Sequence, residues 1–344
     1  MGDKITRETI ARMTNTSVTA VSRVINNSGY VARDKREAIL AAVKETGYRS
    51  KNTALNNANQ GTKQILFVNK DLNNTFTIEL YRGMVHYASK HGYTTLLSAT
   101  LNSEKIKYKL FDGVIIPNNS AMEEYIDIFK GKKYIPAVCA SYGVVFSNSM
   151  RIPLVDADSY IAMEMMIDYL FRKGHRKIAL ATPHRRGGGY DQRYTAYHNK
   201  MAPVLGDEIE DYIFSDETHS TYFAEPEKNY IESGKLLAQK MFEVGIKATA
   251  VCCFNDDLAI GLIQQFGELG VCVPEDISVA GIDGIDMGNY TSPRLTTVSL
   301  SPFVQGSECV RILLDVIQNK KVKMLTNVPI SITERNSVKV LERI

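Results

Sequence analysis

Short apolar stretches alternate with amphipathic helical patterns along most of this chain, from residue 64 onward. Seven apolar stretches predict strands, at residues 65–69, 94–98, 113–117, 135–140, 177–182, 248–254 and 277–283. Helical periodicity lies between most of them, at residues 77–91, 121–131, 157–173, 229–244 and 256–269. Continuously apolar strands that alternate with helices are typical of parallel sheets covered on both faces. About eleven strands are more than one simple sheet usually holds, so the pattern predicts two α/β lobes, each a doubly wound parallel sheet, with ligands bound in the cleft between them.

The first 48 residues have a different pattern, which predicts an all-α unit of three short helices. Thr6 can cap the first helix and Ser17 the second. Asn15 stands between them, and asparagine tolerates the left-handed conformation that a tight turn needs. A third helix is expected at residues 34–46. The apolar positions expected to face inward are Ile10, Ala11, Met13, Val21, Val24, Ile25, Ile39, Leu40 and Val43.

The second of these helices falls on TSVTAVSRVIN, residues 16–26, which is rich in β-branched residues and has poor helix propensity. A helix-turn-helix places its second helix in the DNA major groove. Short side chains there allow a close approach, Arg23 can pair with guanine, and valine methyl groups can contact thymine. Residues 1–60 carry a net charge of +5, against −2 for the rest of the chain, which favours contact with phosphate. A three-helix bundle without a DNA role is the alternative.

The stretch TIARMTNTSVTAVSRVIN, followed by VARDKREAILAAVKETGY, resembles the DNA-binding domain of the lactose-repressor (LacI/GalR) family of bacterial transcription regulators. The resemblance covers Thr6 to Tyr48 and implies that Val18, Thr19 and Arg23 read bases. The full set of expected DNA contacts is Thr6, Ser17, Val18, Thr19, Ser22, Arg23, Asn26, Leu55 and Asn57. Since each chain holds a single such motif, we expect a homodimer that binds a near-palindromic double-stranded operator.

Residues 49–63 are polar and rich in asparagine, which predicts a linker. In the resembled family this segment forms a hinge helix on operator DNA, and a leucine from it wedges into the minor groove. Ser50 stands where proline is usual, and Asn57 stands at the leucine position. Asparagine is a poor wedge. Either hinge-dependent kinking is lost, or Leu55 performs it in a shifted register.

The resemblance continues through the large unit, which is similar to a periplasmic sugar-binding protein. It is carried by NNTFTIELYRGM, YLFRKGHRKIAL, FNDDLAIG, VPEDISVAGIDG and SPRLTTV. It implies an effector-binding and dimerisation core at residues 64–344. The implied first lobe comprises about 64–156 and 288–318, and the second about 157–287 and 319–344. Residues 100–111 are few for a parallel crossover, so we expect an abbreviated turn there and a trimmed surface near the family's dimer interface.

Several polar side chains are expected at strand ends that face the cleft. The resemblance implies effector contacts at Phe76, Ser141, Arg193, Asn255 and Asp283. Carboxylate, amide and guanidinium groups can bond vicinal hydroxyls, and an aromatic ring can stack on the apolar face of a sugar. The expected effector is therefore a sugar or a sugar derivative. Helix capping is the alternative role for Asn255 and Asp283.

Other function classes lack their motifs in this sequence. It contains no GxxxxGK[ST], GxGxxG, nucleophile elbow or metal-ligand cluster, so neither a doubly wound enzyme nor a cofactor is predicted. The five cysteines form no CxxC and mostly lie in apolar runs, which indicates reduced core residues. A solute-binding transport component would explain the lobes but not the N-terminal helices, and neither a signal peptide nor a membrane span is visible. These absences favour a cytoplasmic protein, and the resemblance implies that it is a repressor of carbohydrate-utilisation genes.

Overall fold

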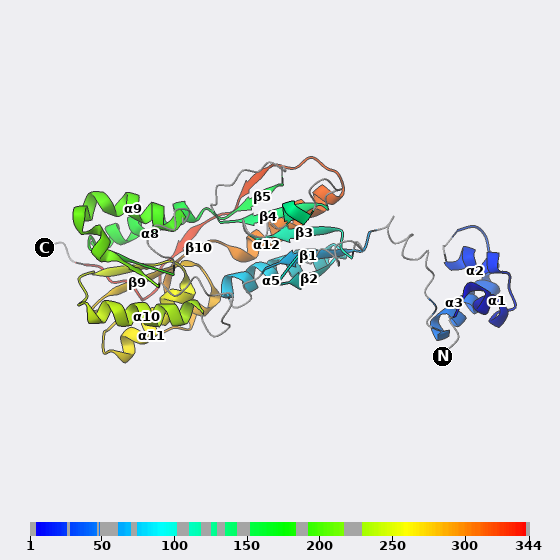
Figure 1. The fold of residues 1–344 in the computed structure, drawn as a ribbon, viewed down its shortest axis with the longest axis horizontal. Helices are drawn as coiled ribbons and strands as arrows, with labels where there is room; N and C mark the ends of the chain where they lie inside the picture. Colours follow the sequence, from blue (N-terminus) through cyan, green and yellow to red (C-terminus); the bar gives the residue numbers. More distant parts are fainter. Residues whose placement is uncertain are drawn as a thin grey trace. The chain divides into compact units, whose positions relative to one another are not determined.

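The computed structural model describes residues 5–25, 28–46, 48, 61–69, 74–101, 110–117, 125–128, 135–142, 152–183, 192–216 and 229–341. The chain divides into two compact units (Figure 1). The smaller unit comprises residues 1–63 together with 109–111, and the larger comprises 64–108 and 112–344. Helices form the smaller unit, and the larger one holds two sheets.

The smaller unit contains the predicted helix-turn-helix. Its helices are α1 (Arg7–Met13), α2 (Val18–Ile25) and α3 (Arg33–Thr46). Thr6 caps α1: its hydroxyl accepts from the Thr9 N–H at 3.3 Å, and the Thr9 hydroxyl accepts in return from the Thr6 N–H at 3.2 Å. The Ser17 hydroxyl accepts from the Ala20 N–H at 3.1 Å at the start of α2. Asn15 adopts the left-handed conformation, with φ 47°, so both predicted caps and the predicted turn are confirmed.

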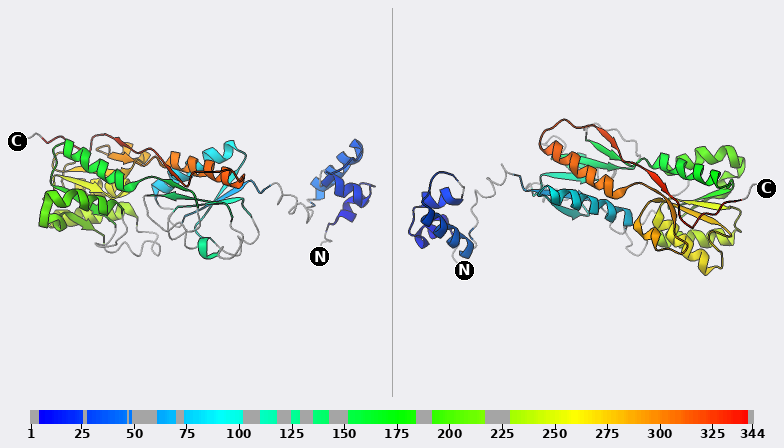
Figure 2. Two further views of the ribbon diagram at one scale, coloured as in Figure 1. Left: turned by 90° about the horizontal axis from the view of Figure 1, so that it is seen from above. Right: turned by 180° about the vertical axis from the view of Figure 1, so that it is seen from behind.

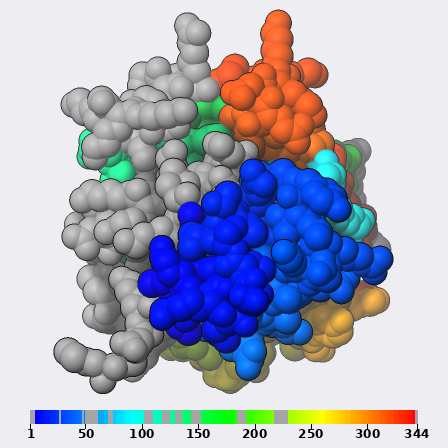
Figure 3. Space-filling model, turned by 90° about the vertical axis from the view of Figure 1, so that its right-hand side faces the viewer, coloured from blue at the N-terminus to red at the C-terminus, as the bar shows by residue number. Residues whose placement is uncertain are grey.

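The core of this unit is small and aliphatic, and Figure 3 shows the unit as a compact blue mass. Its buried side chains are Ile10, Ala11, Val21, Val24, Ile39 and Ala42. Two of the positions expected to face inward are wrong, since Met13 is 52% exposed and Leu40 is 48% exposed. Leu40 lies one position beyond Ile39, which turns it about 100° around the helix. Met13 is the last residue of α1, where the helix no longer packs against the core.

Two six-stranded sheets form the larger unit, one in each lobe. The first has the order β11-β5-β4-β3-β1-β2. Its strands are β1 (Gln64–Val68), β2 (Thr94–Ser98), β3 (Gly113–Ile116), β4 (Ala137–Ser141), β5 (Leu154–Asp156) and β11 (Leu325–Asn327). The second has the order β12-β10-β9-β8-β6-β7. Its strands are β6 (Ile178–Thr182), β7 (Ile213–Ser215), β8 (Ala250–Cys253), β9 (Ser278–Asp283), β10 (Thr296–Ser299) and β12 (Ser331–Thr333). Every neighbouring pair is parallel except β10 with β12.

Helices cover the faces of both sheets, as the alternating pattern predicts (Figure 2). The first lobe carries α5 (Thr75–Lys90) and α12 (Pro302–Ile317); the second carries α8 (Ser159–Arg172), α9 (Gln192–Leu205), α10 (Tyr230–Glu243) and α11 (Asp256–Glu268). Short 3₁₀ helices follow α9 at Gly206–Tyr212 and β9 at Asp286–Asn289. All seven predicted strands are present. Of the helix predicted at 121–131, only residues 125–128 are described, and they are helical.

Glycine allows two helices to pack closely in each lobe. A Cβ atom on Gly306 of α12 would lie 1.9 Å from the backbone oxygen of Leu80 on α5. In the other lobe, a Cβ atom on Gly261 of α11 would lie 1.9 Å from the backbone oxygen of Ile231 on α10. Any larger side chain at either position would force the paired helices apart.

Along the described elements, the chain passes between the lobes three times: between β5 and α8, between β10 and α12, and between β11 and β12. The expected lobe boundaries at 288 and 319 need correction, because they assign β10 to the first lobe and β11 to the second. Pairing shows the reverse, since β10 lies beside β9 and β11 lies beside β5. The two late strands are only four and three residues long, so apolar periodicity marks them weakly.

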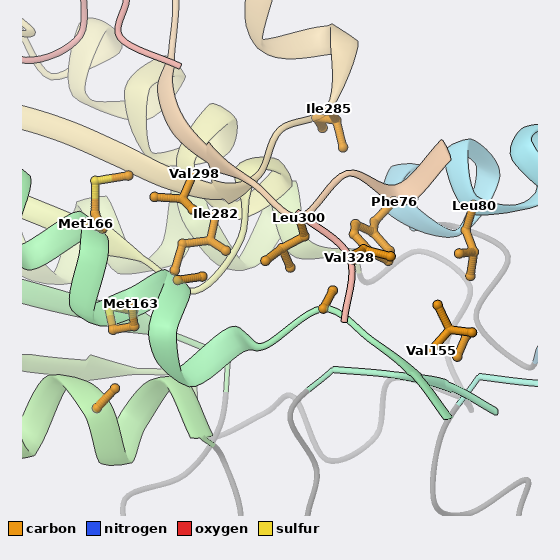
Figure 4. Close-up of a cluster of buried hydrophobic side chains, with 14 of the residues drawn as sticks. Phe76, Leu80, Val155, Met163, Met166, Ile282, Ile285, Val298, Leu300 and Val328 are labelled. Carbon is orange, nitrogen blue, oxygen red and sulfur yellow. The ribbon is translucent and has the colours of Figure 1, made fainter. Parts of the chain in front are cut away.

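Buried apolar side chains join the lobes. Figure 4 shows Phe76 and Leu80 of the first lobe in the same cluster as Ile282 and Ile285 of the second lobe. Leu300, which follows β10 where the chain crosses to the first lobe, belongs to the same cluster. All five are at most 5% exposed. The lobes therefore share one core at this place and do not meet only through polar surfaces.

Candidate DNA interface and effector site

The outer face of α2 carries most of the side chains expected to contact DNA. Val18 is 40% exposed, Thr19 and Arg23 are exposed, and Ser22 is half-buried. Val21 and Val24, on the opposite face, form the core. Ser17 and Thr6 are exposed caps of α2 and α1. Because positions 18, 19, 22 and 23 share one side of a helix, they can enter a groove together.

Arg23 lies at the C-terminal end of α2, beside the turn that follows it. A Cβ atom on Gly29 would lie 3.5 Å from Arg23 Cδ and Nε, an ordinary contact distance, so the stem of the Arg23 side chain packs against this turn. Gly29 has φ 74°, and the Ser28 N–H donates to the Arg23 carbonyl at 2.9 Å. Arg23 therefore rests against a tight turn while its exposed side chain remains able to reach a base or a phosphate.

Several expected DNA contacts lie outside the described residues. These are Asn26 in the helix-turn-helix and Leu55 and Asn57 in the linker. Ser50, at the position where proline is usual, also lies outside them. The shortened connection at 100–111 is described only at its ends, since residues 102–109 also lie outside. The interpretations of the hinge and of the abbreviated turn therefore stay predictions.

The effector residues expected in the second lobe come together at the carboxyl ends of its strands. Asp283 ends β9, Asn255 follows β8, and Arg193 is the second residue of α9; their exposures are 3%, 1% and 8%. The Arg193 Nη1 atom donates to the carbonyl of Phe254 at 2.8 Å, and Nη2 lies 3.4 Å from Asp283 Oδ1. The guanidinium also lies over the Phe254 ring, 4.3 Å from its centroid.

Asp283 has an unusual backbone and a perturbed carboxyl group. Its φ of 141° is rare for a residue other than glycine, and such strain gathers at ligand sites. Burial raises the pKa of its carboxyl well above the ordinary value, and the Arg193 charge opposes that shift. The following 3₁₀ helix begins after Ile285, so Asp283 does not cap it. A strained, desolvated carboxylate at a strand end suits a hydrogen-bonding role toward a ligand.

Asn255 does cap a helix, as the alternative interpretation holds. Its Oδ1 atom accepts from the Leu258 N–H at 2.9 Å at the start of α11. The next residue, Asp256, has a supporting role: its Oδ2 atom accepts from the N–H groups of Gly284 and Ile285 at 2.8 and 2.9 Å. Asp256 thereby fixes the chain directly after Asp283.

The first lobe contributes an aromatic wall. Phe76, the second residue of α5, and Tyr142, just after β4, meet edge to face with their centroids 5.3 Å apart. Ser141 ends β4, is 4% exposed, and accepts at its carbonyl from Gln305 Nε2 at 2.7 Å. Burial raises the pKa of Tyr142, and the charges of Asp283 and Arg193 in the other lobe also act on it. Phe76 lies in the same buried cluster as Ile282 and Ile285, on either side of Asp283, and Tyr142 packs against that cluster, so the aromatic wall lies close to the Asp283 turn.

Sequence reasoning missed four residues of this region. Tyr142 and Phe254 stand directly after β4 and β8, so the strand-end signal that marked Ser141 and Asn255 could have found them. Asp257 and Thr75 contact each other across the lobes. No local signal marks that pair, because acidic residues and threonine are common in the first turn of any helix.

Within the described residues, no cluster of three or more His, Cys, Asp or Glu side chains could hold a metal ion. Nor does any described helix combine the length and the apolar character needed to cross a membrane.

Comparisons with known proteins agree with this architecture. Residues 8–51 match the bacterial regulatory proteins of the lacI family, and residues 167–338 match the periplasmic binding protein-like domain. The chain is 30% identical over 343 residues to the HTH-type transcriptional repressor PurR of Vibrio atlanticus, covering 96% of this chain and 98% of that protein. The PurR of Vibrio cholerae is 29% identical over 345 residues, with 97% and 98% covered. The chain belongs to the LacI family of transcription regulators and is therefore a DNA-binding regulator, not an enzyme.

Solved structures show the same fold. The lac repressor dimer bound to operator and the anti-inducer ONPF has a TM-score of 0.75 at 22% identity, covering 98% of this chain and 100% of that one. A LacI family regulator from Enterococcus faecium with bound ribose has a TM-score of 0.66 at 25% identity, covering 81% and 100%. The two α/β lobes behind a helix-turn-helix are thus those of a lac repressor-like protein.

Proposed function

We propose that this regulator is a homodimeric, cytoplasmic repressor of carbohydrate-utilisation genes, and that a sugar or sugar derivative bound between its lobes controls its affinity for operator DNA. The observation that carries the proposal is the buried Arg193–Asp283 pair beside the Phe76 and Tyr142 rings. An acceptor and a fixed set of donors can bond vicinal hydroxyls, while the rings cover the apolar face of a sugar. The related regulator from Enterococcus faecium, which holds ribose, supports this choice.

In this proposal, residues 1–48 bind DNA, 49–63 form the hinge and 64–344 form the effector-binding and dimerisation core. Val18, Thr19 and Arg23 read bases. The remaining contacts of this domain, to the DNA backbone or to neighbouring bases, are made by Thr6, Ser17, Ser22 and Asn26. Leu55 or Asn57 acts in the hinge. Phe76, Ser141, Arg193, Asn255 and Asp283 hold the effector.

Binding at the cleft can alter DNA affinity only as far as the effector prefers one arrangement of the lobes. The ratio of the effector's affinities for the two arrangements sets the coupling free energy between the effector site and the DNA site. The arrangement of the lobes then sets the separation of the paired hinges in the dimer, and with it the fit of two α2 helices to two half-sites.

A thermal-shift panel tests the effector class. The full chain is heated with pentoses, hexoses, disaccharides, sugar phosphates and nucleosides, because a ligand that binds only the folded state raises the unfolding temperature. A rise with one or more sugars is expected. A rise with nucleosides alone would overturn the sugar assignment, and would leave the DNA-binding assignment in place.

A salt titration of DNA binding tests the interface. Operator-library DNA should bind the full chain with an affinity that falls steeply as salt increases. A chain lacking residues 1–60 is the control and should not bind. Sedimentation should show a dimer, and a monomer with and without DNA would contradict the dimer proposal.

A further inference from the structure

A hydrogen-bonded pair joins the two lobes beside the candidate effector site. Asp257, on the first turn of α11 in the second lobe, accepts at Oδ1 from the Thr75 hydroxyl at 2.9 Å. Its Oδ2 atom accepts from the Thr75 N–H at 3.2 Å. Thr75 is the first residue of α5 in the first lobe, so one carboxylate holds a residue 182 positions away in the chain.

The position of this carboxylate makes the contact favourable. It lies between the N-termini of two helices, α5 and α11, whose dipoles both favour a negative charge there. Asn74 caps α5 by accepting from the Phe76 and Thr77 N–H groups at 2.9 and 3.4 Å. The Asp257 carboxylate accepts from the preceding N–H group of the same helix, that of Thr75. The second lobe therefore supplies part of the cap of a first-lobe helix.

The same contact connects both walls of the site. Phe76 follows Thr75 directly, and Asp256, which precedes Asp257, holds the backbone after Asp283. The Asn255–Asp257 segment thus reaches the aromatic wall on one side and the Asp283 turn on the other. Asp257 is 4% exposed, so water competes little for its oxygens.

We propose that Asp257 is a positioning residue for the effector switch, and that its pair with Thr75 is a clasp that keeps the lobes closed. The proposal builds on the proposed effector function, but the clasp itself requires no particular effector. Among the described residues, the lobes are also joined by the shared apolar cluster, by a hydrogen bond from the Ser159 hydroxyl on α8 to the Tyr142 carbonyl, and by three chain crossings, which permit hinge motion. Losing the clasp should therefore let the lobes separate.

A distance measurement between the lobes tests the clasp without any ligand. Cys272 in the second lobe is exposed, and the other four cysteines are buried, so Cys272 accepts a spin label as it stands. A second label goes on Lys90→Cys, an exposed position at the end of α5 in the first lobe. The labelled full-length chain is mixed with an excess of unlabelled chain, so that only distances within one subunit are recorded by pulsed electron paramagnetic resonance.

The variants separate a clasp from a structural residue. Asp257→Asn replaces one accepting oxygen by an NH₂ group, which then faces a donor of Thr75. Thr75→Val removes the donating hydroxyl. Each variant should add a population with a longer distance between the two spin labels. Thr75→Ser keeps the hydroxyl and should retain the parent distribution, as should Glu268→Gln, which changes the same charge at an exposed site on α11. The double variant Asp257→Asn with Thr75→Val should differ little from either single variant, because both remove one interaction.

The outcomes are distinct. Folded Asp257→Asn and Thr75→Val variants with the parent distance distribution would overturn the clasp. Equal shifts in the serine and valine variants would also overturn it, since the hydroxyl would then have no role. If the clasp variants show a longer label distance but no sugar raises the unfolding temperature of the parent chain, the clasp is supported and the sugar effector is rejected. The two proposals can therefore fail separately.

Discussion

Arg193 Nη2 lies 3.4 Å from Asp283 Oδ1, although the two residues are 90 positions apart and belong to different elements. Their side chains are 9% and 5% exposed, so the pair is desolvated, yet the contact is longer than a close ion pair. A ligand hydroxyl can donate to the carboxylate and accept from the guanidinium at the same time. The pair is therefore able to bind a polyol without first being broken.

Replacing Asp283 by alanine should abolish the effector response and leave ligand-free operator binding nearly unchanged. A hydrogen bond to a charged group contributes about 1.5–3 kcal/mol, which corresponds to roughly tenfold or more in effector affinity. The measurement is operator affinity against effector concentration, with circular dichroism as a control for folding. A folded variant with an unshifted curve would make Asp283 a purely structural residue.

Arg23→Ala should weaken specific operator binding by about 1–3 kcal/mol, the range for one good bidentate base contact. Binding to random DNA should fall much less. Arg33→Ala is a matched control, because Arg33 pairs with Glu37 on the surface of α3 and its side chain is 92% exposed. Equal losses on operator and random DNA would reduce Arg23 to a phosphate contact.

Gly306→Ala should destabilise the larger unit by about 1–3 kcal/mol, the usual cost of overpacking a close contact. The added methyl group meets the backbone of α5, which cannot move aside as a side chain can. Gly267→Ala in α11 is the control: nothing lies within 4 Å of its Cβ position, and the change should stabilise by about 0.5–1 kcal/mol. Urea unfolding of both variants measures the difference.

His175 should make the second lobe sensitive to acid. The ring is fully buried, with Nε2 3.1 Å from the Lys339 carbonyl and Nδ1 2.9 Å from the Thr249 hydroxyl. Burial lowers its pKa below 6.5. The unfolded chain therefore takes up a proton first as the pH falls, and stability should decrease from about pH 6.5 downward. Unfolding free energies from pH 5 to 7.5 should show a smaller decrease in His175→Gln than in the parent chain.

The strongest sequence signals predicted the architecture well, because they follow from burial alone. Six of the seven predicted strands are apolar over most of their length and lie inside a sheet; the seventh, β2, lies at an edge of the first sheet. The five described strands that were not predicted, β5, β7, β10, β11 and β12, are only three or four residues long. Three of them, β7, β11 and β12, lie at the edges of the sheets, and β11 and β12 have much exposed surface. A strand paired on one side only needs little apolar surface, so its pattern resembles a loop.

The candidate site was only partly predictable for a different reason. Asp256 and Asp257 are identical in type and adjacent, but one holds the turn after Asp283 and the other holds Thr75 of the opposite lobe. Their roles differ by the 100° or so between neighbouring positions on a helix. Only the packed structure shows which partner each carboxylate meets.

Strands β11 and β12 have a consequence for synthesis of the chain on the ribosome. They form one edge of the first sheet and one edge of the second, and they are the last two strands in the sequence. Neither sheet can be completed until residues 325–333 have emerged from the ribosome, so both lobes depend on this late segment. A stop codon shortly before residue 325 would leave an open edge on both sheets at once, and such edges invite pairing between nascent chains.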